Sequence, residues 1–183
     1  MFIKHNASDA ELIRECKKGN LKYQEMLYKR FYAYAMGICM RYLINKDDAL
    51  VVVNDAFIKV FNALHNFKDD LEFKPWFRKI LVNTALDSKR KNLKYVYDSE
   101  IPEVHQQTMY PSAIEKLSAA DILNLMKQLP ETHHIVFNLY EIDGYSHKEI
   151  GQMLNIPESS SRTYLTRAKQ ALQKLIQSDL IKI

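Results

Sequence analysis

Apolar residues recur three or four positions apart along most of the 183-residue chain, which predicts helices rather than strands. The longest stretch of this kind runs from about Leu21 to Leu43. Its apolar and aromatic stripe includes Leu27, Phe31, Tyr34, Ile38 and Tyr42. Only 4 Gly and 5 Pro interrupt the chain, too few for the many turns of an all-β fold. The pattern therefore predicts an all-α protein.

Capping residues and helix breakers set the expected ends of the other helices. Ser8 and Glu11 have the spacing of a capping box, and the helix that they begin should end near Gly19. Ser118 and Pro130 are expected where two later helices begin. Further helices are predicted at about 47–64, 73–92, 118–129 and 130–142, with a charged loop at 65–71. The helix expected at 130–142, which Gly144 ends, should bury one apolar face. That face consists of Ile135, Val136, Leu139 and Ile142.

The segment 144–169 is predicted to form a helix-turn-helix. Ser146 and Glu149 form a second capping box at the start of a short helix. The apolar stripe of that helix consists of Ile150, Met153 and Leu154. Asn155 and Pro157 should end it, because Asn tolerates the left-handed conformation and Pro suits the start of the next helix. Two short helices joined by a tight turn make DNA the first partner to consider.

The second helix of this motif has one inward face and one polar face. The inward stripe consists of Ser161, Leu165, Ala168, Leu172 and Leu175. The opposite face carries Ser159, Thr163, Thr166 and Gln170, flanked by Arg162 and Arg167. Hydroxyl, amide and guanidinium groups contact phosphates and base edges, so this face suits a major groove. An ordinary solvated helix is the alternative, but the capped partner helix and the tight turn favour DNA.

The predicted helix at 73–92 has a stripe that passes from apolar to polar residues. Its members are Trp76, Ile80, Asn83, Asp87 and Arg90. In one interpretation Trp76 and Ile80 belong to the core, while Asp87 and Arg90 form a local ion pair. In the other the helix binds opened DNA, with cations tracking phosphates and the interleaved Phe73 and Phe77 stacking on bases. The surrounding cations are Lys74, Arg78, Lys79, Lys89, Arg90, Lys91 and Lys94.

Charge and composition divide the chain into two small helical domains. Residues 1–97 carry 18 Lys and Arg against 11 Asp and Glu, an excess that favours nucleic acid or an anionic protein surface. Residues 93–117 have no sustained helical period, and their scattered acids and prolines indicate a flexible linker. The predicted boundaries are 8–95 for the first domain, 96–117 for the linker and 118–178 for the helix-turn-helix domain.

Cysteine usage and hydropathy limit the functional classes. Cys16 and Cys39 lack the close spacing of a zinc or redox motif, so we expect buried thiols in a reducing compartment, with no metal and no cofactor. No apolar run approaches the ~20 residues of a membrane span. The polar start does not resemble a signal peptide. We therefore expect a soluble cytoplasmic protein without membrane insertion.

The run from Trp76 to Arg90 resembles the W-x-x-x-I-x-x-N-x-x-x-D-x-x-R pattern of bacterial extracytoplasmic-function (ECF) sigma factors. The segment Asn54–Phe61 is similar to their Q-E-x-F-x-x-x-W segment. Matches to the family's second domain are Leu129-Pro130, Val136-Phe137, Gly144-Tyr145-Ser146, Glu149-Ile150 and Arg167-Ala168-Lys169. The resemblance spans roughly residues 8–176, and two sets of motifs separated by a linker are far more specific than any one motif.

The resemblance implies an RNA polymerase sigma factor, which directs transcription initiation without covalent chemistry of its own. The first domain would dock on the clamp of core RNA polymerase through Asp48, Asn54, Asp55 and Phe57. It would read and open the minus-ten element of promoter DNA with the loop 66–72 and with Lys74, Trp76, Arg78, Lys79, Asn83, Asp87 and Arg90. The second domain would sit on the polymerase flap. It would read the minus-thirty-five element with Ser159, Ser160, Arg162, Thr163, Thr166, Arg167, Lys169 and Gln170. An anti-sigma factor is a further implied partner.

Some residues depart from the family pattern, and two other functions stay open. Leu50-Val51-Val52 stands where the family has acids and a leucine, Ser161 replaces a usual Val, and Tyr164 stands where Arg is common. The first alternative is a helix-turn-helix transcriptional regulator that binds duplex DNA without polymerase. The second is a helical enzyme that uses His133, His134 and His147 with a metal. Adjacent histidines point about 100° apart on a helix, and the chain has no His-x-x-x-His motif.

Overall fold

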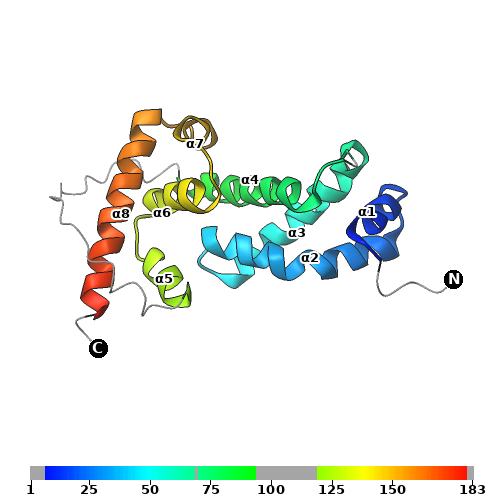
Figure 1. Ribbon diagram of the computed structural model, residues 1–183, viewed down its shortest axis with the longest axis horizontal. Coiled ribbons are helices and arrows are strands. Elements are labelled where there is room, and N and C mark those ends of the chain that lie inside the picture. Colours follow the sequence, from blue (N-terminus) through cyan, green and yellow to red (C-terminus); the bar gives the residue numbers. More distant parts are fainter. Residues whose placement is uncertain (1–6, 69, 94–118, 181–183) are drawn as a thin grey trace. The chain divides into compact units, whose positions relative to one another are not determined.

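The structure is a computed structural model that describes residues 7–68, 70–93 and 119–180. Within these ranges the chain forms helices and no strand, so the all-α prediction is confirmed (Figure 1). The residues fall into two compact units, one within 1–94 and one within 95–183. The predicted linker at 96–117 and the cap at Ser118 lie outside the described residues. Of the helices in these ranges, none is both long enough and apolar enough to cross a membrane.

Over residues 7–68 and 70–93, the first unit forms four α-helices and one 3₁₀ turn. These are α1 (Asp9–Lys17), α2 (Leu21–Tyr42), α3 (Lys46–Ala63), η1 (Leu64–Asn66) and α4 (Phe73–Leu93). Side chains cap the first three helices: Ser8 accepts a hydrogen bond from the Glu11 amide, and Asn20 and Asn45 cap α2 and α3. Gly19 has a φ of 76°, which allows the reversal after α1. The predicted helix ends in this unit are confirmed to within two residues.

Phenylalanines build the core of the first unit. Phe77 of α4 is fully buried, and its ring centroid lies 4.9 Å from Phe57 of α3 and 5.4 Å from Phe73. Phe31 of α2 lies 4.8 Å from Phe73. The rings thereby join α2, α3 and α4, which pack on one another pairwise, while α1 packs on α2.

The second unit is organised around its last helix. Its elements are α5 (Ala119–Met126), α6 (Glu131–Phe137), the π-helical segment η3 (Asn138–Ile142), α7 (His147–Leu154) and α8 (Glu158–Leu180). α5, α6 and α7 all pack on α8. A small apolar cluster joins α5 to the C-terminal half of α8 through Leu125, Met126, Leu172 and Ile176.

The prediction of one regular helix over 130–142 is wrong in its last part. The α-helical pattern stops at Phe137, and the Asp143 amide donates to the Asn138 carbonyl, five residues back, at 2.9 Å. The wider turn rotates each residue less than an α-helix does. Ile135, Val136 and Leu139 are buried as expected, but Ile142 is 38% exposed and does not join the inward stripe.

Candidate nucleic-acid interface

The helix-turn-helix has the predicted caps and a turn with little room. The capping box is confirmed, since Ser146 Oγ accepts from the Glu149 amide at 3.3 Å and Glu149 Oε2 accepts from the Ser146 amide at 2.8 Å. Asn155 has the left-handed φ of 55° that was expected at the end of α7. A Cβ at Gly151 would lie 2.9 Å from the Ile156 carbonyl oxygen. Only glycine therefore lets the turn pass this close to α7.

The faces of α8 follow the predicted division. Ser161 and Ala168 are fully buried, and Leu165 and Leu172 are buried with them. Of the residues predicted to touch DNA, those exposed are Ser159, Arg162, Thr163, Thr166 and Lys169, and those half-buried are Ser160, Arg167 and Gln170. All eight therefore lie outside the buried stripe, on a surface that α8 presents to solvent.

Several polar groups of this α8 surface already have partners within the chain. Lys169 Nζ lies 2.7 Å from Glu141 Oε1, and Arg162 pairs with Glu158 one turn before it. The hydroxyls of Thr163 and Thr166 donate to helix carbonyls four residues back, each at 3.1 Å. They present lone pairs outward, so in the free protein these two hydroxyls can accept hydrogen bonds from a partner.

The histidines of the second unit pack within it. His133 is buried against Tyr164 with ring centroids 5.3 Å apart, and burial, aided by the charge of Arg167, lowers its pKa. His134 is also buried, and His147 stacks on Tyr140. Across the residues that the structure describes, no group of three or more His, Cys, Asp or Glu is placed to hold a metal ion.

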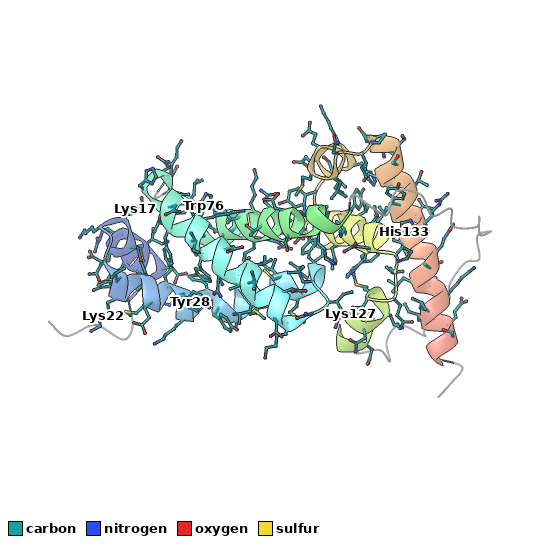
Figure 2. The ribbon with its side chains drawn as sticks, turned by 180° about the vertical axis from the view of Figure 1, so that it is seen from behind. Lys17, Lys22, Tyr28, Trp76, Lys127 and His133 are labelled. Carbon is teal, nitrogen blue, oxygen red and sulfur yellow. The ribbon has the colours of Figure 1, made fainter. Side chains whose placement is uncertain are left out.

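The polar stripe on α4 is largely open to solvent. Lys74, Lys79, Asn83 and Asp87 are exposed, and Trp76 and Arg78 are half-buried. The side chain of Arg90 lies outside the described part of the structure. Trp76 is not a core residue, and aromatic contacts position its ring. The ring centroid lies 4.8 Å from that of Phe67 and 5.8 Å from that of Phe73. Lys17 restrains the backbone at Phe67, because its Nζ donates a hydrogen bond to the Phe67 carbonyl at 2.7 Å. Figure 2 labels Lys17 and Trp76.

The proposed stacking of DNA bases on Phe73 and Phe77 is wrong. The two rings are 5% and 0% exposed, because they fill the core between α2, α3 and α4. A 3.6-residue period places cations and rings near each other in sequence but does not say which side of the helix meets the core. Trp76 is thus the aromatic side chain of this helix that reaches the surface.

Among the predicted polymerase contacts on α3, three are exposed and one is not. Asp48, Asn54 and Asp55 are open to solvent, although Asn54 Oδ1 also accepts from the Tyr28 hydroxyl at 2.9 Å. Phe57 is 2% exposed and packs against Tyr28 and Phe77, so its ring has no surface to offer a partner. The assignment of Phe57 to a contact surface is therefore wrong, and it is a core residue.

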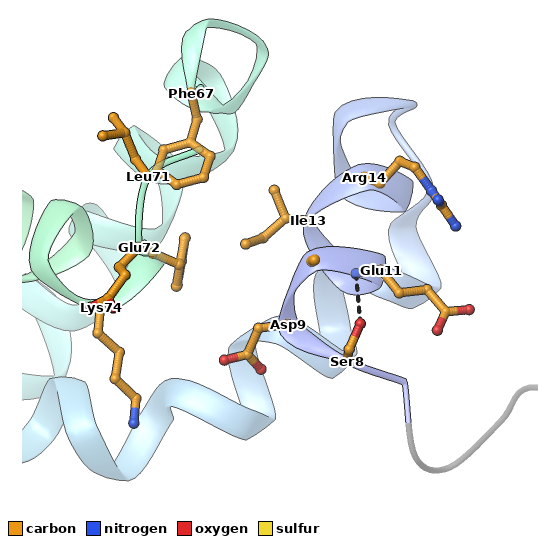
Figure 3. A pocket seen from close by; sticks show the side chains of 11 residues that line it. Ser8, Asp9, Glu11, Ile13, Arg14, Phe67, Leu71, Glu72 and Lys74 are labelled. Atoms are coloured by element: carbon orange, nitrogen blue, oxygen red, sulfur yellow. Dashed lines mark hydrogen bonds between the residues drawn. The ribbon is translucent and has the colours of Figure 1, made fainter. Parts of the chain in front are cut away.

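A pocket of about 730 Å³ lies between α1 and the segment 67–74 (Figure 3). Ile13, Phe67, Leu71 and Phe73 supply apolar lining, and the charged residues around it are Asp9, Glu11, Arg14, Glu72 and Lys74. Phe67, Leu71 and Glu72 of this lining belong to the loop 66–72, for which the sequence predicts contact with the minus-ten element.

Comparison with known proteins shows the family of this chain. Residues 27–94 match the family model described as Sigma-70 region 2, and residues 119–172 match that described as Sigma-70, region 4. Together the two matches take in more than half of the chain. The chain belongs to the sigma-70 family.

Similar proteins that span nearly the whole chain place this sigma factor in the ECF group. It is 26% identical to the ECF RNA polymerase sigma-E factor of Escherichia coli strain K12, over 93% of this chain and 95% of the relative. It is 25% identical to the RNA polymerase sigma-H factor of Pseudomonas aeruginosa, over 92% of this chain and 94% of the relative.

Solved structures share the fold of this sigma factor. The sigma factor RpoE of Bartonella quintana, solved with the anti-sigma factor NepR, has a TM-score of 0.53 at 19% identity and covers 85% of this chain and 97% of its own. CnrH, solved with the cytosolic domain of CnrY, has a TM-score of 0.51 at 21% identity, covering 93% and 98%.

Sequence reasoning missed two features of this sigma factor. Lys59 of α3 reaches across to α4, where its Nζ lies 3.1 Å from Thr84 Oγ1 and 3.4 Å from Asp87 Oδ2. The predicted partner of Asp87 was Arg90, and only the packing of α3 on α4 shows Lys59 beside it. The second feature is exposed apolar surface on α3, where Ile58 is 58% exposed and Val51 is 59% exposed. A search for apolar residues on the outer side of the α3 period would have found it.

Proposed function

We propose that this sigma factor docks on the clamp of core RNA polymerase through the outer face of α3. Asp48, Asn54 and Asp55 give that face polar groups, and Val51 and Ile58 give it exposed apolar surface. An apolar centre with a polar rim is the usual composition of a protein interface. The apolar Leu50-Val51-Val52 segment thereby replaces acidic contacts with aliphatic ones, since Val51 is open to the partner while Val52 stays in the core.

The minus-ten element is proposed to bind along α4 and the loop before it. Lys74, Arg78 and Lys79 offer cations to phosphates, Asn83 offers an amide to a base edge, and Trp76 offers a partly exposed ring. The pocket between α1 and the loop before α4 is large enough to hold a base that is flipped out of the duplex. Binding of the base there would offset the free-energy cost of unstacking it, about a few kcal/mol. The ammonium of Lys59, 3.4 Å from Asp87 Oδ2, would offset the negative charge of that carboxylate near the phosphates.

The minus-thirty-five element is proposed to receive α8 in its major groove. Binding would exchange the internal partners of Arg162 and Lys169 for DNA phosphates or base edges, and would leave the buried stripe in place. The second unit would sit on the polymerase flap, so that both elements are read by one assembled complex.

Other parts of the proposal follow from action on polymerase. The sigma factor carries out no covalent chemistry, because the polymerase supplies the active site, and it works in the cytoplasm with the polymerase. An anti-sigma factor holds it inactive; the complex of the sigma factor RpoE with the anti-sigma factor NepR supports this part of the proposal.

The observation that carries the proposal is the solvent-facing polar surface of α8, held next to a capped α7 by a turn that admits only glycine at 151. The test is promoter footprinting with core polymerase, with and without the sigma factor. Replacing Arg162 and Thr163 by Ala should remove upstream protection and leave polymerase binding intact. Lys174→Ala, an exposed cation further along α8 that is outside the predicted contacts, is the control. Specific duplex binding without any polymerase complex would instead support a helix-turn-helix regulator.

A further inference from the structure

A buried polar contact joins the two helices of the helix-turn-helix. His147, the first residue of α7, is 9% exposed, and Ser161 of α8 is 0% exposed. His147 Nδ1 lies 2.9 Å from Ser161 Oγ. The imidazole also stacks on Tyr140 of η3, with ring centroids 4.3 Å apart and planes 19° apart. Three elements therefore meet at one side chain.

Ser161 cannot touch DNA while it is fully buried, but its neighbours can. Arg162 and Thr163 follow it directly and are exposed on the outer surface of α8. Because a helix is stiff over a few turns, its rotation and tilt at Ser161 determine where these two side chains point. An effect of Ser161 on DNA binding would therefore act through the placement of the helix.

Apolar packing alone leaves that placement loosely defined. Leu165 and Ala168 hold α8 on the rest of the unit, but burial of apolar surface is not directional. A hydrogen bond has a narrow range of distance and angle, and a buried one is costly to break. The contact between His147 and Ser161 supplies a directional restraint between α7 and the first turn of α8.

We propose that His147 and Ser161 are positioning residues, which fix the orientation of α8 on the minus-thirty-five element. The proposal rests on the function proposed above for the second unit. It assigns a role in promoter recognition to two side chains that make no contact with DNA.

The charges around His147 make the arrangement sensitive to acid. Burial lowers its pKa, Arg162 and Lys169 on α8 add to that effect, and Glu158 on the same helix opposes it. Tyr140, from η3, stacks on the imidazole. An imidazole released from this site titrates near its usual pKa of about 6.5. The closed arrangement is therefore fully stable above that pH and loses stability as the pH falls toward the lowered value.

Four variants of the full chain, each assembled with core polymerase, test the proposal by promoter binding at pH 8 and pH 6. Ser161→Ala removes the hydroxyl. His147→Phe keeps a ring for Tyr140 but loses the hydrogen bond. His147→Asn places an amide near the position of Nδ1 and does not titrate in this range. Ser178→Ala is the matched control, because Ser178 is an exposed serine of α8 whose hydroxyl donates to the Leu175 carbonyl.

At pH 8, Ser161→Ala and His147→Phe should weaken promoter binding about three- to tenfold, the fold-change that loss of one buried hydrogen bond gives. His147→Asn and Ser178→Ala should bind like the wild type. At pH 6 the wild type and Ser178→Ala should lose affinity, while His147→Asn should not. Far-ultraviolet circular dichroism of each variant shows whether it is folded.

Two results would overturn the proposal while the proposed function stands. One is wild-type affinity for folded Ser161→Ala and His147→Phe at both pH values. The other is the same loss at pH 6 in His147→Asn as in the wild type. If the unsubstituted holoenzyme leaves the minus-thirty-five element unprotected, the function of the second unit fails before any variant is compared, and the positioning role fails with it.

Discussion

The two cysteines show how burial controls chemistry at a single residue. Burial raises the pKa of Cys16 to about 11, with a smaller contribution from the charge of Glu15, and burial raises the pKa of Cys39 to about 12. The thiolate is the reactive form, so at pH 8 about one Cys16 in a thousand is ionised. The prediction of two buried thiols is confirmed.

We predict that neither thiol of the native protein reacts with an aromatic disulfide reagent at pH 8 on the timescale in which the urea-unfolded chain reacts fully. Absorbance of the released thiolate measures this. Rapid reaction of two thiols per native chain would show that α1 and α2 open locally around Cys16 and Cys39.

Phe77 is expected to be the most sensitive core position of the first unit. It is fully buried and contacts Phe31, Phe57 and Phe73. Phe77→Ala should lower the free energy of unfolding by about 3–5 kcal/mol, from lost burial and the cavity left behind. Urea unfolding followed by the fluorescence of Trp76, the one Trp of the chain, measures the effect in this unit.

Phe61→Ala is the control for that substitution, since Phe61 is a half-buried phenylalanine of α3 whose ring centroid lies 6.0 Å from that of Phe57. It should cost clearly less than Phe77→Ala. Equal losses for the two variants would contradict the description of Phe77 as the centre of the core.

At the scale of the element, two helical glycines should respond to alanine in opposite directions. Gly37 lies in α2 with open space where a Cβ would go, whereas a Cβ at Gly151 would meet the Ile156 carbonyl. Gly37→Ala should stabilise the first unit by about 0.5–1 kcal/mol, because glycine is entropically costly in a helix. Gly151→Ala should destabilise the second unit by about 1–3 kcal/mol through overpacking.

Trp76 fluorescence reports the first unit, and amide hydrogen exchange in α7 and α8 reports the second. Gly37→Ala should move the unfolding midpoint detected by Trp76 fluorescence to a higher urea concentration. Gly151→Ala should speed amide hydrogen exchange in α7 and α8. A stabilised Gly151→Ala would show that the turn between α7 and α8 has room for a side chain.

The outer face of α3 should act as a docking surface without being needed for folding. Val51 and Ile58 are 59% and 58% exposed, so replacing both by Ser removes little buried surface. We predict that the double variant binds core polymerase at least about tenfold more weakly, because the loss of central apolar contacts weakens other protein interfaces by a similar factor. Its unfolding midpoint should stay near that of the wild type.

Fluorescence titration of labelled core polymerase measures the affinity, and Leu21→Ser, a change at an even more exposed apolar residue outside α3, is the control. Unchanged affinity in the α3 variant would place the polymerase contact elsewhere.

Local signals in the sequence predicted the helix ends well, because a cap needs only its own residue and the next three. Ser146 with Glu149, and Asn155 after them, gave the limits of α7 correctly. The π-helical η3 was not predicted, since a five-residue hydrogen bond has no distinct apolar period. The face of α8 was predicted because its stripe is long.

Partners across the fold could not be predicted in the same way. The burial of Phe57, Phe73 and Phe77 depends on how α3 and α4 rotate against each other. The contact of Lys59 with Asp87 joins residues 28 positions apart in sequence. A period identifies a face, but tertiary packing decides which face meets the core and which is left for DNA or polymerase.

Across the whole chain, the balance of charged residues differs between the two units. Residues 1–97 hold an excess of cations, 18 against 11 acids, whereas residues 121–183 carry seven of each, and two of those cations pair with acids of α8 and η3. The first unit can attract DNA through its general charge. The second unit has no such excess of cations, so we expect its affinity for DNA to depend on the outer surface of α8.

The two units are proposed to read two promoter elements for one polymerase. The most direct measurement is transcription of a genomic template by core polymerase from the protein's own host, with and without the sigma factor, followed by sequencing of transcript 5′ ends. We predict new starts that share two sequence elements at a fixed spacing upstream. The absence of sigma-dependent starts, or starts that share only one element, would show that the two units do not read two promoter elements for polymerase.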